Sequence, residues 1–293
     1  MTSVITSTTN AELESIAREI RFRTIRNSHL TGTPHLGSCL SCTDLLVWLY
    51  WRVLRVDSRN PQHPDRDRFI LSKGHAAPVL FQVLAERGFF PLEGLETYGQ
   101  DGSLFGEHPP TPDHLPGIEA ATGSLGHGLP MALGMALASR LQGLGYHVYA
   151  ILSDGECNEG SVWESALMAA AQHVANLTIF IDYNKWQATG RSNEVLGLAP
   201  LAEKWQAFGW TTSEIDGHSF DAMGEALHTL SSQDRPKAVI CNTVKGKGIP
   251  FMEDDNNWHY RIPSALEVAQ CAEILSIPKS QLRLEGRVPL SHG

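Results

Sequence analysis

HVYAILSDGECNEG at residues 147–160 and LTIFIDYNKW at residues 177–186 are the two stretches that decide the fold. Each opens with an apolar run rich in β-forming residues and ends in polar residues and turn formers, which is typical of a buried strand. The segment between them, 161–173, has the pattern of a helix. A strand, a helix and a second strand in this order predict two parallel neighbouring strands, because parallel strands need a long crossover connection.

The same alternation extends outward along the chain. We predict further strands and helices, and two longer loops between them. The predicted strands are 69–72, 210–215 and 237–243; the predicted helices are 11–28, 43–54, 75–87, 126–144, 199–208 and 219–230; the loops are 31–38 and 99–117. We therefore expect an α/β fold with a parallel β-sheet covered by helices on both faces. Residues 1–10 are expected to form a flexible tail, and 11–293 a single domain.

Composition and charge exclude several classes of protein. The chain has 293 residues, of which 42% are hydrophobic, so it can bury a large core. Its net charge of -9 makes nucleic acid an unsuitable partner, because binding to a phosphate backbone requires clustered Lys and Arg. A few local cations can still attract small anionic substrates.

Neither the N-terminus nor the apolar runs indicate a membrane protein. The longest apolar run, 45–51, is far shorter than the roughly 20 residues of a transmembrane helix, and no signal peptide is visible. The five cysteines include a CxxC pair, Cys39 and Cys42, but no further ligands follow at zinc spacing. We expect reduced thiols in a cytoplasmic protein that has no membrane association.

Polar residues follow the two deciding strands where each ends. Asp154 and Asn184 come after neighbouring parallel strands, so their side chains should meet at one edge of the sheet. Carboxylate and amide oxygens suit Mg²⁺ or Ca²⁺, and Mg²⁺ is usually shared with phosphate. Gly155 would let a phosphate approach the backbone. An ordinary turn, with Asp as a cap and Asn as a turn former, explains the same pair equally well.

Several histidines belong to segments expected near the same edge. They are His35, His75, His108 and His259. A single histidine is more often a surface or hydrogen-bonded residue, but four at one sheet edge argue against coincidence. Neutral imidazoles can bind sugar hydroxyls and move protons near neutral pH. The segment 123–126 precedes a helix whose N-terminal amides could face an anion.

Asp154-Gly155 followed 30 positions later by Asn184 resembles the thiamine-diphosphate signature, which is Gly-Asp-Gly and then Asn at this spacing. Further blocks are similar to the N-terminal part of transketolase and occur in the same order. These blocks are His35-Leu36-Gly37, Ser72-Lys73-Gly74-His75, Gly123-Ser124-Leu125-Gly126 and Thr243-Val244-Lys245-Gly246-Lys247-Gly248. The similarity runs from about residue 11 to residue 265.

The resemblance implies a cofactor and a metal ion. Asp154, Asn184 and the main-chain carbonyl of Trp186 would hold Mg²⁺ or Ca²⁺, and the ion would bridge the diphosphate of thiamine diphosphate. The residues that the resemblance implies for cofactor binding are His75, Gly123, Ser124, Leu125, Gly155, Asn184 and His259.

The resemblance also implies a reaction, the transfer of a two-carbon ketol unit from a ketose or ketose phosphate to an aldose. The cofactor carries out the difficult step, and the protein supplies orientation, charge and exclusion of water. His75 and His259 would lie near the diphosphate and the reacting carbon, and His35 and His108 would bind sugar hydroxyls. Glu159 and Glu164 match acidic positions that communicate with the cofactor site of a partner.

Some residues depart from the family pattern. Ser153 replaces the first Gly of the signature, and Trp186 is bulky where an aliphatic residue is usual. Pro34 and Ser38 flank the His35 block, and Tyr260 follows His259 where a small residue is common. These changes surround the expected substrate channel and affect the choice of sugar more than the binding of cofactor.

A full transketolase carries two more domains, whereas the segment 263–293 has room for one helix. The resemblance therefore implies a partner chain, a C-terminal transketolase subunit with pyrimidine-type and C-terminal domains, in an α2β2 assembly. The partner would supply the Glu that activates the cofactor. The apolar residues Trp163, Leu167 and Met168 are candidates for a dimer contact, although they would serve equally well to face the sheet.

Two other functions fit the sequence less well. One is half of a different thiamine-diphosphate enzyme, similar to deoxyxylulose-phosphate synthase, which would share the metal signature. The other is a catalytically silent subunit for assembly or regulation. A silent subunit has no need of Asp154, Asn184 and the four histidines, so their presence favours the enzyme.

Overall fold

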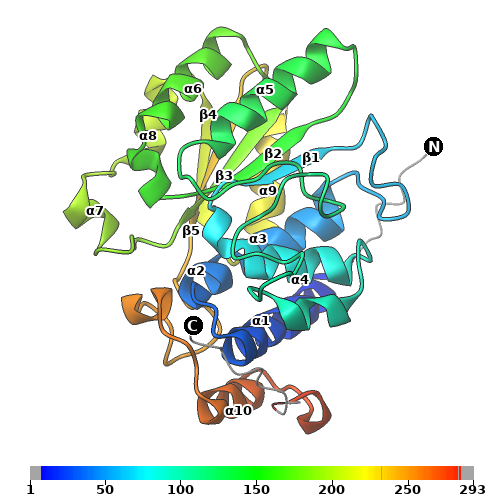
Figure 1. Ribbon diagram of the computed structural model, residues 1–293. Coiled ribbons are helices and arrows are strands. Elements are labelled where there is room, and N and C mark those ends of the chain that lie inside the picture. Colours follow the sequence, from blue (N-terminus) through cyan, green and yellow to red (C-terminus); the bar gives the residue numbers. More distant parts are fainter. Residues whose placement is uncertain (1–7, 232, 283, 285–293) are drawn as a thin grey trace.

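The centre of the molecule is a parallel β-sheet (Figure 1). The computed structural model describes residues 8–231, 233–282 and 284. Its five strands lie in the order β1-β2-β3-β5-β4, and every neighbouring pair is parallel. The strands are β1 (Arg68–Leu71), β2 (Val148–Ser153), β3 (Leu177–Tyr183), β4 (Thr211–Asp216) and β5 (Lys237–Asn242). All five predicted strands are confirmed, with ends that differ by no more than one residue.

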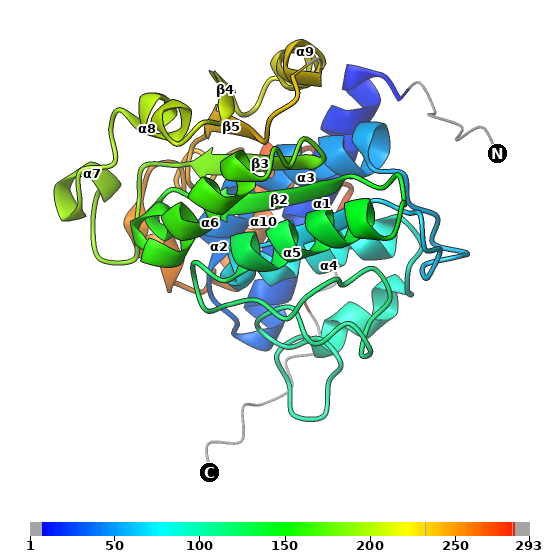
Figure 2. The same cartoon turned by 90° about the horizontal axis from the view of Figure 1, so that it is seen from above.

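Both faces of the sheet are buried at its central strands, as the continuous apolar runs predicted. Every residue of β2 and of β3 is buried. Successive residues of β2 point to opposite faces, so Ile151 packs in one hydrophobic cluster and Ala150 in the other. Figure 2 shows α5 and α6 on one side of β2, and α3 on the other.

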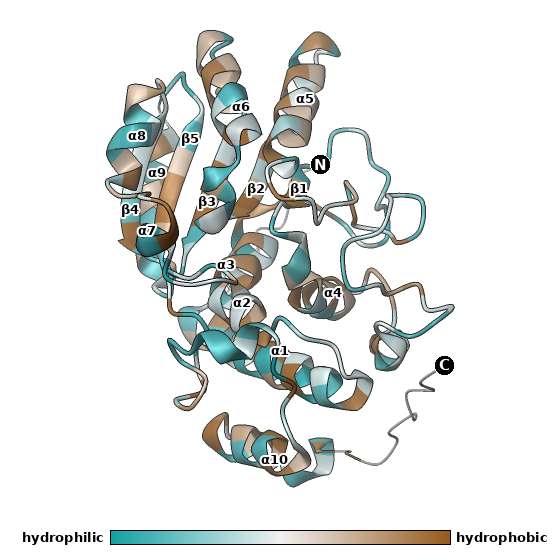
Figure 3. Ribbon diagram, turned by 60° about the vertical axis from the view of Figure 1, so that its left-hand side comes forward, coloured by the Kyte–Doolittle hydropathy of each residue, from teal (hydrophilic) through white to brown (hydrophobic). Residues whose placement is uncertain are grey.

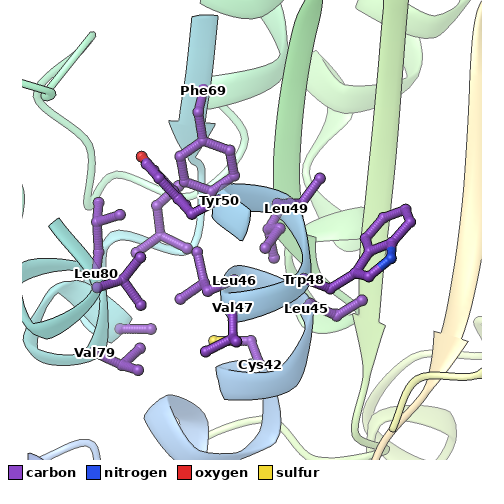
Figure 4. Close-up of a cluster of buried hydrophobic side chains, with 14 of the residues drawn as sticks. Cys42, Leu45, Leu46, Val47, Trp48, Leu49, Tyr50, Phe69, Val79 and Leu80 are labelled. Carbon is purple, nitrogen blue, oxygen red and sulfur yellow. The ribbon is translucent and has the colours of Figure 1, made fainter. Parts of the chain in front are cut away.

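One face is covered by helices from both ends of the chain. These are α1 (Asn10–Thr31), α3 (Thr43–Trp48), α4 (Ala77–Glu86) and α9 (Phe220–Ser231). Figure 4 shows the core beneath them, where residues 45–50 meet side chains of α4 and β1. The ring centroids of Trp48 and Phe180 are 5.8 Å apart, and those of Tyr50 and Phe69 are 5.4 Å apart. The longest apolar run of the sequence is therefore a core segment.

The other face is covered by α5 (Gly128–Leu141), α6 (Gly160–Ala171) and α8 (Leu201–Ala207). Helices such as α6 and α8 carry both teal and brown bands in Figure 3, as expected of amphipathic helices with one face on the sheet. Trp205 is fully buried, with its ring 5.0 Å from that of Trp163 and 4.9 Å from that of Trp210. Trp163 thus belongs to the protein's own packing.

A third hydrophobic cluster lies away from the sheet. Here α10 (Ala265–Ile274) packs beyond α1 (Figure 1), and α10 is the one helix predicted within 263–293. Trp258 is fully buried in this cluster, together with Phe22 of α1. The segment before α10 is therefore held in place close to His259. Within the described ranges, no helix has the length and apolar character that crossing a bilayer requires.

The structure corrects three predictions near the N-terminus. The helix α1 begins at Asn10 and runs to Thr31, with Thr9 forming a capping box, so residues 8–10 are not part of a flexible tail. The rest of that predicted tail, 1–7, lies outside the described residues. The predicted loop 31–38 ends early because α2 (Leu36–Ser41) begins there and buries Leu36 and Leu40. The predicted helix 43–54 is α-helical only to Trp48 and continues as a short π-helix over Leu49–Val53.

Candidate functional site

The carboxyl edge of the sheet brings the sequence-predicted residues together. Asp154 directly follows β2, Asn184 directly follows β3, and Thr243 directly follows β5. Ser153 is paired with Asp182 in the register of β2 and β3, so both strands end at the same level. The short helix α7 (Ser192–Val195) closes the loop that follows Asn184.

Asp154 is fully buried and is surrounded by hydrogen-bond donors. Its Oδ2 accepts from the backbone N–H of Lys185 at 2.9 Å and from Ser192 Oγ at 2.7 Å, and its Oδ1 accepts from the N–H of Gly155 at 2.9 Å. Burial raises the pKa of Asp154 to about 6; the hydrogen bond from Ser192 opposes this rise and the charge of Asp182 adds to it. A bound cation would favour this costly carboxylate charge.

Asn184 lies beside Asp154 and is also buried. Its Oδ1 accepts from the backbone N–H of Trp186 at 3.0 Å, which fixes the turn that starts the loop. The loop then folds back, since Ser192 N donates to the carbonyl of Lys185 at 3.1 Å and Gln187 N donates to that of Gly190 at 2.8 Å. We call residues 185–192 the metal-loop hairpin. Asp154 thus holds the base of this hairpin through Lys185 and Ser192, and Asn184 is bonded to Trp186 within it.

The donor set at this edge fits a divalent ion that is shared with an anion. One carboxylate, one amide oxygen and one main-chain carbonyl are hard ligands, but they are too few and carry too little charge for a complete cage. Consistently, no group of three or more His, Cys, Asp or Glu side chains within the described ranges could hold a metal ion. Gln187 Nε2 is a buried donor with no acceptor among these residues, and a Cβ at Gly155 would lie 2.9 Å from Gln187 Cγ.

The four histidines form one cluster. The ring of His35 lies 5.5 Å from that of His75, 6.3 Å from that of His108 and 5.1 Å from that of His259, between centroids. The rings of His75 and His259 are 5.7 Å apart. His35 has a φ of 77° and precedes α2, and its N–H donates to the carbonyl of His259 at 2.9 Å. The exposed Tyr260 ring lies 6.2 Å from that of His35.

Three rings of the cluster are neutral near neutral pH. Burial and, to a smaller extent, nearby cationic groups including Lys245 lower the pKa of His35 to about 4 and that of His259 to about 3. Burial and the charge of Lys73 hold the pKa of His75 well below its usual range. Neutral rings can both donate and accept hydrogen bonds, as binding of hydroxyl groups requires.

Acid should destabilise the protein through these rings. The unfolded chain binds protons at His35 and His259 below pH 6.5, whereas the folded protein binds them only below about pH 4 and pH 3. The contribution of these rings to the free energy of unfolding is therefore fully present above pH 6.5 and is lost as pH falls below that value. His35→Asn, which tolerates a left-handed backbone, should remove roughly 1–2 kcal/mol of the loss between pH 7 and 4.5. Urea unfolding across this range tests it, and parallel curves for both proteins would contradict it.

A buried ion pair lies beneath the site. Lys73 and Asp182 are both fully buried and bonded to each other, and Lys73 Nζ also donates to the carbonyl of Ser38 at 2.9 Å. Asp182 accepts further bonds from Ser41 Oγ at 2.6 Å and from Thr243 Oγ1. Burial alone would raise the pKa of Asp182, but Lys73 and these bonds lower it overall. The pair ties the ends of β1, β3 and β5 together.

Lys245 is a functional candidate that the sequence reasoning missed. Its Nζ donates to Asn256 Oδ1 at 2.6 Å and lies 3.3 Å from His259 Nδ1. Because an ammonium group can only donate, His259 Nδ1 accepts and its Nε2 carries the proton. Burial and the charge of Lys73 lower the pKa of Lys245 to about 8. The sequence does point to Lys245, because it lies in the Thr243–Gly248 block of the family resemblance, but the resemblance alone gave it no role.

The predicted cofactor loop 123–126 lies against the histidine cluster. Gly123 has a φ of 147°, and a Cβ there would lie 2.7 Å from His108 Cδ2, so a side chain would strain the backbone and collide with the ring. The buried carboxylate of Glu156 holds the loop by accepting from the N–H of Gly126 at 2.8 Å and from Ser72 Oγ. Ser124 and Leu125 lie between these two fixed points.

Glu164 lies apart from this arrangement, whereas Glu159 borders the cofactor loop, where a Cβ at Gly126 would lie 2.6 Å from Glu159 Cβ. Both are exposed on α6 or at its start, and in the described part of the chain neither side chain makes a hydrogen bond or an ion pair. Leu167 and Met168 on the same helix are 57% and 51% exposed, so they do not face the sheet, whereas Trp163 packs inward. Trp163 therefore faces the sheet, whereas Leu167 and Met168 remain candidates for a dimer contact.

Comparison with known families gives one match to most of the chain. Residues 13–283 match the family model described as "Transketolase, thiamine diphosphate binding domain". The match includes every residue that the sequence predicted for the site.

Curated relatives fall into two groups by length. The chain is 40% identical over 243 residues to the 6-deoxy-6-sulfo-D-fructose transketolase subunit SqwG of Clostridium sp. (strain MSTE9), covering 83% of this chain and 88% of that protein. It is 39% identical to an apulose-4-phosphate transketolase subunit from Actinobacillus succinogenes, covering 90% of this chain and 96% of that protein. With transketolase-like protein 2 of Bos taurus it shares 37% identity, over 96% of this chain and only 44% of that protein.

Solved structures share the fold. Transketolase from Campylobacter jejuni superposes with a TM-score of 0.85 at 24% identity, over 94% of this chain and 43% of that one. Transketolase from Leishmania mexicana gives a TM-score of 0.84 at 24% identity, over 90% and 41% of the two chains. At this identity the likeness supports the arrangement of strands and helices, and the predicted α/β fold with a helix-covered parallel sheet is confirmed.

Proposed function

We propose, from the premise that this chain belongs to the transketolase family, that it is the N-terminal subunit of a two-chain transketolase. It would transfer a two-carbon ketol unit from a ketose or ketose phosphate to an aldose, with residues 11–293 acting as one diphosphate-type domain. The observation that carries this proposal is the meeting of Asp154 and the metal-loop hairpin with four histidine rings at one sheet edge.

In this function, Asp154, Asn184 and the carbonyl of Trp186 would hold Mg²⁺ or Ca²⁺, and the ion would supply positive charge for the diphosphate of the cofactor. Thiamine diphosphate, when bound, supplies the carbon chemistry that ketol transfer needs and that side chains lack. The backbone at Gly155 and the loop of Gly123, Ser124 and Leu125 bind the cofactor. In support of this, neither Gly155 nor Gly123 has room for a side chain, and the hydrogen bond from Gly126 to Glu156 fixes the loop.

The histidines orient the substrate and move protons. His75 and His259 serve the cofactor and the reacting carbon, while His35 and His108 bind the hydroxyl groups of the sugar. The Nε2–H of His259, set by the contact of Lys245 with Nδ1, is available as a donor. Low pKa values keep His35 and His259 neutral at the working pH, so each ring has one nitrogen that donates a hydrogen bond and one that accepts.

Lys245 supplies positive charge for the diphosphate, and this makes binding dependent on pH. Its pKa of about 8 means that it loses its charge as pH rises through that value. We expect the affinity for thiamine diphosphate, measured by calorimetry with the partner present, to fall roughly tenfold between pH 7.5 and 9. Lys245→Arg, which stays charged, should remove this dependence. An equally steep loss in the Arg variant would contradict the assignment.

The partner is a C-terminal transketolase subunit with pyrimidine-type and C-terminal domains, in an α2β2 assembly. The lengths of the relatives support this: the chain spans nearly all of two proteins named as subunits but under half of a longer transketolase-like protein. The exposed Leu167 and Met168 offer an apolar contact surface, and Glu159 and Glu164 beside them have side chains free to meet the partner. Five buried free cysteines support a cytoplasmic location.

The proposed function is tested by mixing the chain with a C-terminal transketolase subunit, thiamine diphosphate, Mg²⁺, a ketose phosphate and an aldose. Appearance of the product ketose, dependent on both chains, is expected. Turnover of pyruvate with no turnover of ketoses would favour an enzyme similar to deoxyxylulose-phosphate synthase. Assembly with the partner, but an Asp154→Ala variant that leaves the rate unchanged, would identify a silent subunit.

A further inference from the structure

The metal-loop hairpin is tied to a second loop that is distant in the sequence. At its base, Asp154 receives bonds from Lys185 and Ser192, as described above. Higher up, Trp186 and Arg191 face each other across an antiparallel bridge. The position of the hairpin therefore determines where the carbonyl of Trp186 lies.

Asp254, in the loop that leads to His259, holds both of these residues. Its Oδ1 accepts from Trp186 Nε1 at 2.7 Å and from Arg191 Nη1 at 2.6 Å, and its Oδ2 accepts from Arg191 Nη2 at 2.6 Å. The guanidinium of Arg191 also lies 3.8 Å from the centroid of the Trp186 ring. A single exposed ion pair contributes little, but a bidentate pair joined to an aromatic ring and an indole donor restricts all three side chains.

Asn256 makes a second link between the same two segments. Its Nδ2 donates to the carbonyl of Ala188, at the tip of the hairpin, at 3.1 Å. Its Oδ1 accepts from Lys245 Nζ at 2.6 Å, and that Nζ lies 3.3 Å from His259 Nδ1. The backbone N–H of Asp254 donates to the carbonyl of Lys245 at 2.8 Å. The hairpin, Lys245 and His259 are thus joined through two neighbouring residues of one loop.

We propose that Asp254 and Asn256 are positioning residues that clamp the metal-loop hairpin over the site before cofactor binds. The clamp sets the carbonyl of Trp186 and the ammonium of Lys245 at the same time, so the metal ligands and the diphosphate-facing cation are arranged together. This inference rests on the proposed function for its ligand, but the clamp itself is a property of this chain. It also gives the indole at position 186 a task that an aliphatic side chain cannot perform, because Nε1 donates to Asp254.

Hydrogen–deuterium exchange on the full chain without cofactor tests the clamp. Asp254→Ala should speed exchange of the amides of 185–192 at least roughly tenfold. The hairpin then loses three hydrogen bonds and the restraint that holds the Arg191 guanidinium against the Trp186 ring. Asp254→Asn keeps an acceptor for the indole and should fall between wild type and Ala. Glu194→Gln is the matched control, since Glu194 is exposed on α7 and exchange should not change. Unchanged exchange in Asp254→Ala would overturn the clamp.

The positioning role is tested by the Mg²⁺ concentration at which thiamine diphosphate binding to the chain and its partner is half-maximal. Asp254→Ala should raise this concentration roughly tenfold, and excess Mg²⁺ should restore full stoichiometry, because the ligands are still present but poorly placed. Asp154→Ala should not be rescued in this way. Faster exchange with an unchanged Mg²⁺ requirement would overturn the positioning role.

Failure of the two proposals can be told apart. If the wild-type complex binds no thiamine diphosphate at any Mg²⁺ concentration, the proposed function fails, and the clamp then stands or falls on the exchange measurement alone. If the wild type binds and Asp254→Ala behaves like Glu194→Gln in both measurements, the clamp fails and the proposed function is unaffected.

Discussion

Asp154→Ala is expected to abolish metal-dependent binding of thiamine diphosphate, with a loss of at least about 100-fold in affinity and in rate. Substitution of residues that only support a metal ligand already costs roughly 10–100-fold, and Asp154 is proposed as the ligand that carries the charge. Calorimetry and the transfer assay with the partner present measure the two losses. Retention of metal-dependent binding within tenfold would contradict the assignment of Asp154.

Asp154→Asn separates this loss from a loss of folding. Burial raises the pKa of Asp154 to about 6, so its ionised form is costly to the folded protein. A neutral amide removes this cost but turns one accepting oxygen into a donor beside Gly155 or Lys185, so stability at pH 7 should fall by no more than about 1–3 kcal/mol. Metal binding should still be lost. In the wild type, metal binding should weaken as pH falls through about 6, because protons and the ion compete for the same carboxylate. If Asp154→Asn lowered the stability of the fold but kept metal binding, Asp154 would mainly support the fold.

Lys73→Met is expected to destabilise the protein by about 3–5 kcal/mol, because it leaves the buried carboxylate of Asp182 without its cation. Changes in the midpoint of urea unfolding measure this effect. The double variant Lys73→Met, Asp182→Leu should recover part of the loss, since no charge is left uncompensated. The recovery should be incomplete because Ser41 and Thr243 lose their acceptor.

Arg59→Met provides the matched control for that experiment. Arg59 pairs with Asp57 on the surface, where their side chains are 88% and 48% exposed, and loss of such a solvent-screened pair should leave the unfolding midpoint nearly unchanged. If Lys73→Met and Arg59→Met were equally mild, the buried pair would not be the support that its geometry indicates.

The strands could be predicted because their signal is local. Runs such as Leu177–Ile181 are apolar and rich in β-formers, and each is followed by polar residues within a few positions. Once the strands are parallel, the meeting of Asp154 with the loop after β3 follows from topology alone. The start of α2 was missed since Pro34 and Gly37 indicate a loop, while the burial of Leu36 and Leu40 favours a helix.

The contacts that complete the site could not be predicted, because they join residues distant in the sequence. Lys73 and Asp182 are 109 positions apart, and Arg191 and Asp254 are 63 apart. Nothing in the local pattern around Lys73 distinguishes a buried, paired cation from a surface one. The structure also places Glu159 and Glu164 on an exposed helix face, where their proposed contact with a partner stays a prediction.

The most direct test of the central claim is a calorimetric titration of thiamine diphosphate with Mg²⁺ into this chain, first alone and then mixed with a C-terminal transketolase subunit. We predict tight binding in the mixture that disappears when the metal is chelated, because in the proposed function the ion would be held by Asp154 and Asn184 together with the cofactor. Binding in the mixture that is unaffected by chelation, or absence of binding in an assembled mixture, would contradict the account.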